Sequence, residues 1–113
     1  MVSELKITQD GDVTIVELAG EVNTNTAPEV QSQIMPLVKP GAKLVLDMTK
    51  VNYMSSAGLR VLLWLYRQVS GSDGRIVLVG LNDDIENVMT VTGFLQFFTV
   101  TETLEAGIAA LAD

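Results

Sequence analysis

The stretch "KLVLDMTKVNYMSSAGLRVLLWLYRQV", residues 43–69, predicts a strand followed by a helix. Residues 43–48 form a short run of leucine and β-branched side chains, which is typical of a strand buried on both faces. A helix follows from about residue 56 to 70, and Ser55-Ser56-Ala57-Gly58 stands at its start. Glycine in a first turn costs roughly 0.5–1 kcal/mol relative to alanine. The sequence therefore places a small, hydroxyl-rich surface at this helix end.

Upstream of this unit, the pattern predicts a hairpin and a helix. Residues 4–8 and 12–18 alternate with strand period around an Asp-Gly turn. Residues 25–38 predict a helix with Thr26 as its N-cap and Glu29 as the capping-box partner. Pro28 suits the first turn of that helix, and Pro36 should kink it or end it early.

Downstream, the pattern predicts a second buried strand, a helix, a short strand and a terminal helix. The two strands are residues 75–80 and 97–100. The first of the two helices should start near Asp83, with Asp83 and Glu86 at capping-box spacing, and stop at Gly93. The terminal helix lies within residues 101–113 and is opened by Thr101 and Glu102.

This order of elements predicts a single α/β domain that spans residues 1–113. A hairpin followed by βα units gives a mixed sheet of about five strands, with about four helices mainly on one face. The composition agrees, because 48% of the residues are hydrophobic and 19% are charged, which is typical of a compact globular chain.

The net charge of −7 argues against two classes of partner, nucleic acid and anionic membrane. The apolar runs are far shorter than the roughly 20 residues that span a bilayer. The charged N-terminal segment, "MVSELKITQD", lacks the apolar core of an export signal. We therefore expect a cytoplasmic protein.

The inventory of reactive side chains argues against an enzyme. With no cysteine and no histidine, the chain lacks disulfides, thiolate chemistry and the commonest general base and metal ligand. Asp83, Asp84 and Glu86 cluster as metal ligands do, but a helix N-terminus also favours such charges, and we prefer that interpretation. Asp47 ends a predicted strand without a catalytic partner. We expect no catalytic residue, no metal and no cofactor.

Two interpretations remain for Ser55-Ser56-Ala57-Gly58. In the first, one serine caps the helix and Gly58 packs closely against a neighbouring element. In the second, a serine here is a modification switch, because a helix start tolerates the roughly −1.5 to −2 charges that phosphorylation adds. A partner docked over that helix end would then meet a buried dianion.

Residues 44–63, "LVLDMTKVNYMSSAGLRVLL", resemble the signature of STAS-domain anti-sigma factor antagonists. That signature is a strand ending in Asp, a short loop, and a helix start carrying serine and Gly-Leu. Residues 20–30, "GEVNTNTAPEV", resemble an earlier loop of the same family. The resemblance covers essentially the whole chain, and the family's order of elements is the order inferred above.

This resemblance implies partner switching. In the family, the unphosphorylated antagonist binds a serine-kinase-type anti-sigma factor and so frees the sigma factor. The kinase phosphorylates the antagonist and ends the complex, and a metal-dependent serine phosphatase restores it. Carried onto this chain, the acceptor is Ser56, with Met54, Ser55, Ala57 and Gly58 lining the contact. We expect the free protein to be a monomer.

Two residues depart from the family pattern. Many members have Asp directly before the acceptor, where this chain has Ser55, and Asp in the earlier loop, where it has Asn23. Both changes remove negative charge beside the acceptor, and Ser55 becomes a competing acceptor. We count Asn23 among the partner-binding residues.

Arg60, Trp64 and Arg67 predict an exposed stripe that extends the partner surface, since their spacing puts them on one helix face. The alternative is a solvated face with Trp64 folded over neighbouring carbons. The core side of this helix should consist of Leu59, Leu62, Leu63, Tyr66 and Val69. We expect Gly58 to serve the approach of the partner and not the fold, so that Gly58→Ala would leave stability unchanged or higher.

Two other functions stay open at this point. One is a STAS scaffold or sensor that binds partners in a multi-protein regulatory complex without being phosphorylated. The other is a small-molecule or nucleotide-binding domain with a catalytic role.

Overall fold

The structure, a computed structural model, describes residues 4–112 and has the predicted order of strands and helices. The strands are β1 (Glu4–Asp10), β2 (Val13–Val22), β3 (Lys43–Met54), β4 (Arg75–Val79) and β5 (Thr99–Thr101). The helices are α1 (Ala27–Ile34), α2 (Ser56–Gly71), α3 (Asp83–Val91) and α4 (Leu104–Ala110), with short 3-10 helices η1 (Met35–Leu37) and η2 (Phe94–Phe97). The predicted α/β class is confirmed.

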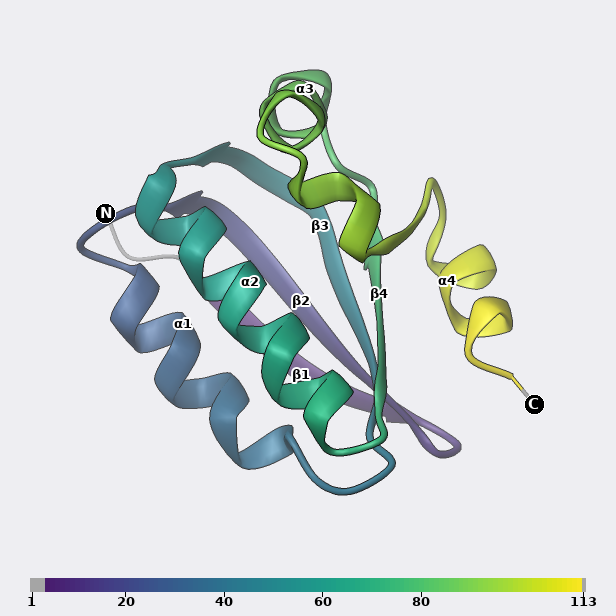
Figure 1. The fold of residues 1–113 in the computed structure, drawn as a ribbon. Helices are drawn as coiled ribbons and strands as arrows, with labels where there is room; N and C mark the ends of the chain where they lie inside the picture. Colours follow the sequence, from purple (N-terminus) through teal and green to yellow (C-terminus); the bar gives the residue numbers. More distant parts are fainter. Residues whose placement is uncertain (1–3, 113) are drawn as a thin grey trace.

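The five strands form one mixed sheet in the order β1-β2-β3-β4-β5. β1 is antiparallel to β2, and β2 to β5 run parallel to one another. In this arrangement the carboxyl ends of the parallel strands share one edge of the sheet. Both α2 and α3 begin at that edge, directly after β3 and β4 (Figure 1).

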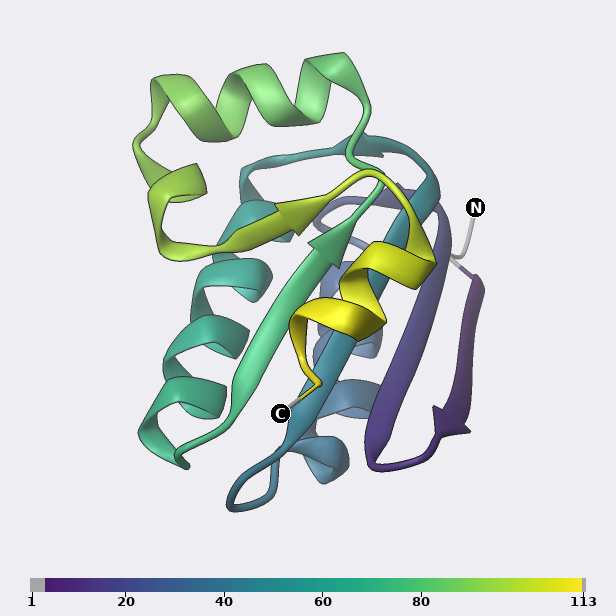
Figure 2. The same ribbon diagram turned by 90° about the vertical axis from the view of Figure 1, so that its right-hand side faces the viewer.

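The sheet separates a large core from a small one. Alternate residues of β3 point to opposite faces, so Leu44 and Leu46 belong to the large core and Val45 belongs to the small one. The large core is covered by α1 and α2, which lie side by side, together with buried residues of α3. Within residues 4–112, α4 is the helix that covers the opposite face (Figure 2). Most of the helical cover therefore lies on one face, as predicted.

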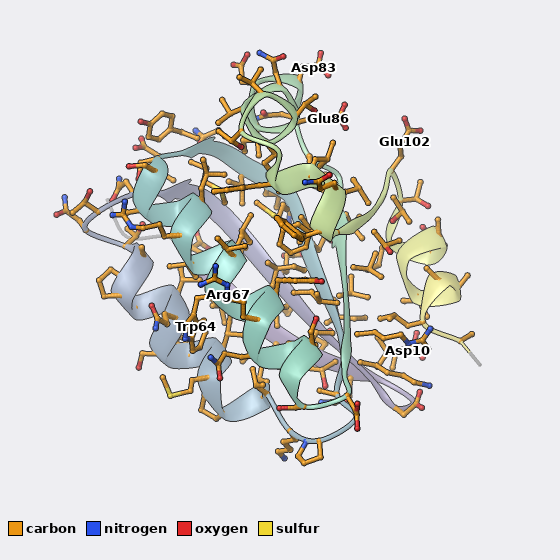
Figure 3. All side chains as sticks on the ribbon, viewed as in Figure 1. Asp10, Trp64, Arg67, Asp83, Glu86 and Glu102 are labelled. Carbon is orange, nitrogen blue, oxygen red and sulfur yellow. The ribbon has the colours of Figure 1, made fainter. Side chains whose placement is uncertain are left out.

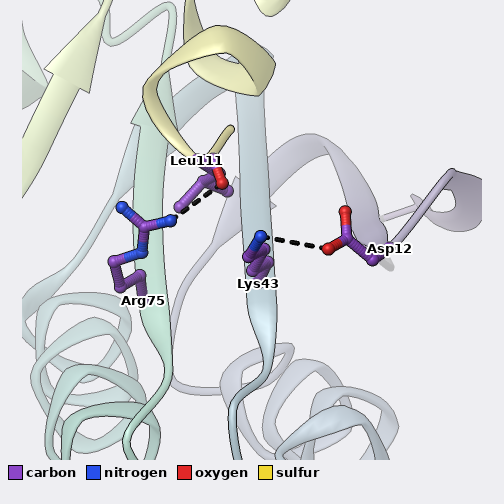
Figure 4. A network of polar contacts seen from close by, with 4 residues as sticks. All are labelled: Asp12, Lys43, Arg75 and Leu111. Carbon is purple, nitrogen blue, oxygen red and sulfur yellow. Dashed lines mark hydrogen bonds and ion pairs between the residues drawn. The ribbon is translucent and has the colours of Figure 1, made fainter. Parts of the chain in front are cut away.

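Polar contacts hold α4 and the first hairpin to the ends of the central strands (Figure 4). The Arg75 guanidinium donates to the Leu111 carbonyl oxygen at 2.8 Å, next to the fully buried Leu111 side chain. The Lys43 ammonium forms an ion pair with Asp12 at 3.0 Å. These contacts place the start of β3 and β4 against the turn after β1 and the end of α4.

β3 is longer than the sequence indicated. The prediction ended the strand at residue 48, whereas the strand continues to Met54. The pairing of β3 with β4 ends at Asp47. Beyond that residue β3 pairs with β2 alone, for example Val51 with Gly20 and Met54 with Val22. Polar side chains at 49, 50 and 52 hid this extension, because a strand paired on one side only is largely exposed.

α3 begins at Asp83, as predicted, and α4 begins at Leu104, but both helices are capped by residues other than those predicted. α3 is capped by Asn82 and not by Asp83, since Asn82 Oδ1 accepts a hydrogen bond from the Ile85 N–H at 2.8 Å. α4 is capped by Thr103 and not by Thr101 or Glu102, since Thr103 Oγ1 accepts from the Ala106 N–H at 3.1 Å. The last predicted residue of that helix, Asp113, lies outside the described residues.

The predicted capping box of α1 is wrong, although Thr26 does occupy the N-cap position. The Thr26 hydroxyl donates to the Glu21 carbonyl at 2.9 Å and accepts from the Asn23 N–H at 2.9 Å, so it binds the preceding loop. The Glu29 carboxylate accepts from Gln33 at 3.2 Å and does not turn back to the cap. Pro36 ends the α-helix early, as predicted: α1 stops at Ile34 and the chain continues as η1.

Candidate functional site

Ser55 holds the start of α2 in place. It is the N-cap residue, with an extended backbone, and its Oγ accepts a hydrogen bond from the Ala57 N–H at 3.2 Å. Its own N–H donates to the Val22 carbonyl oxygen at 2.9 Å, which ties this helix end to the last residue of β2. Ser55 is half-buried, and both its hydroxyl and its amide serve the fold.

Ser56 is the first residue of α2 and is exposed. Within residues 4–112 its hydroxyl makes no hydrogen bond, in contrast to that of Ser55. The geometry thus separates two adjacent serines that the sequence alone left in competition. Ser55 caps the helix, and Ser56 presents a free hydroxyl to solvent.

Gly58 packs inside the protein, which contradicts the expectation that it serves only a partner. A β-carbon built on it would lie 2.6 Å from Met54 Cγ and 2.8 Å from the Val22 carbonyl oxygen. Both Gly58 and Met54 are buried in the free chain, because α2 crosses close to the end of β2 at this point. They lie beneath the surface that Ser56 and the half-buried Ala57 present.

Asn23 organises the loop between β2 and α1. Its side-chain oxygen accepts from the backbone N–H groups of Asn25 at 2.9 Å and Thr26 at 3.1 Å. Its side-chain nitrogen donates to the Glu21 carboxylate at 3.3 Å. Two of these three bonds need only an oxygen, so the neutral amide replaces the carboxylate of the family pattern without leaving the loop N–H groups unpaired.

The predicted stripe on α2 is partly exposed and borders a groove. Arg60 and Arg67 are exposed. Trp64 is half-buried: it packs against the large core without being enclosed in it. Figure 3 shows Trp64 and Arg67 on α2. Arg60, Trp64 and Ala57 line a groove of about 430 Å³ between α2 and the first turns of α1. The other lining residues are Thr24, Ala27, Pro28, Gln31 and Val61.

The core side of α2 is wider than predicted. Leu59, Leu62 and Val69 are buried as expected, while Leu63 and Tyr66 are half-buried. Val61 and Leu65 are also buried and were missed. They were missed because α2 contacts both the sheet and α1, which widens the buried arc beyond a single stripe.

A second, smaller groove also went unpredicted. It has a volume of about 170 Å³ and lies between the end of β3 and α3. Tyr53 and Met54, which line it, lie three and two residues before Ser56. Tyr53 is 52% exposed and Val88 on α3 is 42% exposed, so side chains from both walls of the groove reach solvent. The available signal was the aromatic Tyr53 next to the serine pair.

The acidic residues do not form a metal site in the described part of the chain. Asp83, Asp84 and Glu86 are exposed in the first turn of α3, and residues 4–112 contain no group of three potential ligands arranged for a metal ion. The Asp47 carboxylate is buried and accepts from the Thr49 N–H at 3.1 Å and the Thr49 hydroxyl at 2.6 Å. Asp47 therefore shapes β3 locally.

No helix within residues 4–112 is both long enough and apolar enough to cross a membrane.

Comparison with known proteins identifies the family. The STAS domain family matches residues 4–107. The fold agrees: a crystal structure of a candidate anti-sigma factor antagonist from Thermotoga maritima superposes with a TM-score of 0.89 at 21% identity, over 95% of this chain and 93% of that chain. This chain belongs to the STAS domain family.

Its curated relatives are named as anti-sigma factor antagonists. BtrV of Bordetella bronchiseptica, named as a candidate anti-sigma factor antagonist, is 35% identical over 109 residues, which are 94% of each chain. The anti-sigma-B factor antagonist of Listeria monocytogenes is 34% identical over 93 residues, which are 81% of this chain and 82% of the relative. The Bacillus antagonist SpoIIAA shares the fold in its phosphorylated form, with a TM-score of 0.75 at 17% identity over 96% of this chain and 100% of that chain.

Proposed function

We propose that this chain is an anti-sigma factor antagonist that works by partner switching. Its unphosphorylated form binds a serine-kinase-type anti-sigma factor and frees the sigma factor, phosphorylation of Ser56 ends the complex, and a serine phosphatase restores it. The observation that carries the proposal is the exposed Ser56 hydroxyl, unbonded within the described chain and next to a serine that already caps the helix. The names of the relatives at 35% and 34% identity support the same role.

The chemistry of the modification fits this position. The Ser56 oxygen attacks the γ-phosphorus of ATP, the bond to the β-phosphate oxygen breaks, ADP leaves, and the hydroxyl proton passes to a base of the kinase. Because Ser56 is the first residue of α2, the new negative charge lies at the positive end of the helix dipole. The fold should therefore tolerate the phosphate.

A partner docked over Ser56 would not tolerate it. Burying an unpaired charge at an interface costs about 2–5 kcal/mol, which is roughly 30-fold to several-thousand-fold in affinity. We place that interface over Ser56 and Ala57, the groove beside Trp64, and the exposed Arg60 and Arg67. Tryptophan and arginine are the residue types that most often carry binding energy at interfaces. In this role the chain would act in the cytoplasm, as one domain that is monomeric when free.

The test is a phosphorylation assay with the kinase partner captured from the protein's own cells. The wild-type chain, Ser56→Ala and Ser55→Ala are each incubated with that kinase and ATP, and the phosphosite is mapped by mass spectrometry. We expect phosphate on the wild-type chain and on Ser55→Ala, and none on Ser56→Ala, which should stay bound to the kinase. Phosphate only on Ser55 or on a threonine would overturn the assignment. A captured partner that binds without any phosphorylation would indicate a STAS scaffold instead.

A further inference from the structure

Arg60 lies one helical turn after Ser56 on the exposed side of α2. Residues four apart on a helix share a face, with β-carbons about 5–6 Å apart. Within residues 4–112, the Arg60 side chain makes no ion pair or hydrogen bond. A guanidinium that is unpaired within the described residues is therefore within reach of the exposed Ser56 hydroxyl.

We propose that Arg60 binds, within the same chain, the phosphate that phosphorylation places on Ser56. This inference rests on the proposed function, because it requires a phosphate at that position. A phosphoserine brings about −1.5 to −2 charges and three acceptor oxygens, and a guanidinium offers parallel N–H donors that match two of them. An anion four residues before a cation is also the favourable order along a helix.

Among the charged residues near this end of α2, Arg60 is the cation placed to bind the phosphate on Ser56. Arg67, the other cation of α2, is seven residues further on, about 10 Å along the helix axis. The elements that meet at this end of α2 contribute the acids Glu21, at the end of β2, and Asp84, at the start of α3. Neither acid pairs with Arg60 within residues 4–112, so the guanidinium is not already held by a carboxylate.

The pairing gives phosphorylation a second effect on the partner surface. Arg60 lines the groove with Ala57 and Trp64, so the guanidinium lies at the edge of the surface proposed to receive the partner. When it turns to the phosphate, the partner loses an exposed cation and meets a new anion at the same time. The phosphorylated chain then differs from the unphosphorylated chain at two side chains.

The test uses the full chain with phosphoserine encoded directly at position 56, so no kinase is needed. The second ionisation of the phosphate is followed by ³¹P NMR in the otherwise wild-type chain, in Arg60→Gln and in the matched control Arg67→Gln. We expect the proton affinity of the phosphate to be two- to threefold higher in Arg60→Gln than in the wild-type chain, because the cation that stabilises the dianion is gone. Arg67→Gln should titrate like the wild-type chain.

A second measurement reports on the guanidinium itself. The Arg60 Nε–H resonance should move when Ser56 is replaced by phosphoserine, while the Arg67 resonance should not. The inference is overturned if Arg60→Gln titrates like the wild-type chain and the Arg60 resonance stays in place. Because neither measurement involves a partner, this failure is distinct from a failure of the proposed function, which would appear as absent phosphorylation by the captured kinase.

Discussion

The Val22 carbonyl oxygen accepts a hydrogen bond from the Ser55 N–H at 2.9 Å. The same oxygen lies 2.8 Å from the position that a β-carbon on Gly58 would occupy. One backbone group at the end of β2 thus fixes both the cap of α2 and the closeness of its first turn. The start of α2, which carries the candidate acceptor, is built against this group.

We expect Gly58→Ala to destabilise the protein by about 1–3 kcal/mol, because the new methyl group forces Val22 and Met54 to move. Gly71→Ala is the matched control, since a β-carbon there meets nothing within 4 Å and the residue lies in the same helix. Gly71→Ala should leave stability unchanged or raise it by up to about 1 kcal/mol. Urea unfolding followed by circular dichroism compares the two variants, and equal midpoints would contradict the close approach at Gly58.

The two serines should respond differently to removal of the hydroxyl. Ser55→Ala loses the hydrogen bond to the Ala57 N–H and should cost about 0.5–2 kcal/mol of stability. Ser56→Ala removes an exposed hydroxyl that makes no hydrogen bond within residues 4–112, so its free energy of unfolding should stay within about 0.5 kcal/mol of wild type. Thermal melting of both variants measures the difference. A larger loss for Ser56→Ala would reverse the roles assigned to the two residues.

Asn82 should matter more to α3 than the acid that follows it. Asn82→Ala removes the cap bond to the Ile85 N–H and the contact of the side-chain nitrogen with the Val51 carbonyl at 3.3 Å. We expect a loss of about 1–2 kcal/mol. Asp83→Asn, which removes only a charge near the helix dipole, should cost about 0.3–1 kcal/mol. Equal losses in chemical denaturation would indicate that charge, and not the cap, stabilises this helix start.

Trp64 is a built-in reporter of the groove beside α2. Its half-buried side chain should emit as a partly solvated indole in the free protein and shift to the blue when the kinase partner covers it. The exposed Arg67 should contribute to the same contact, so Arg67→Ala should cost at least about 1 kcal/mol of binding with an almost unchanged melting temperature. Emission spectra and a binding titration test both statements. An emission maximum that the partner leaves unchanged would place the contact elsewhere.

The sequence predicted the order of the elements because each carries its own local signal. The strand period of β1 and β2, the apolar run that opens β3 and the helical spacing of α2 are all visible within a dozen residues. Residues 49–54 gave no such signal, because a strand paired on one side keeps polar side chains. The cap of α3 was misplaced by one residue, since Asn82 and Asp83 are both good caps and only the backbone geometry separates them.

The candidate site was predictable to the extent that it is local. The small, hydroxyl-rich start of α2 and the arginine stripe could be predicted from spacing, whereas the choice of Ser56 as the acceptor came from the resemblance to the family. The role of Gly58 could not, because the atom it approaches belongs to Val22, which lies 36 residues earlier in the chain. Trp64 and Tyr53 each border a groove whose other wall comes from a distant segment, α1 or α3. Such walls exist only after the sheet has brought these segments together.

The separate duties of Ser55 and Ser56 have a consequence for the speed of the proposed switch. If a single hydroxyl both capped α2 and accepted the phosphate, each round of modification would break a hydrogen bond of the fold and each dephosphorylation would have to remake it. Here the cap bond belongs to Ser55, so phosphorylation of Ser56 would leave it in place. On the proposed function, no refolding step would separate the two forms, and the kinase and the phosphatase would set how fast the protein returns to its partner.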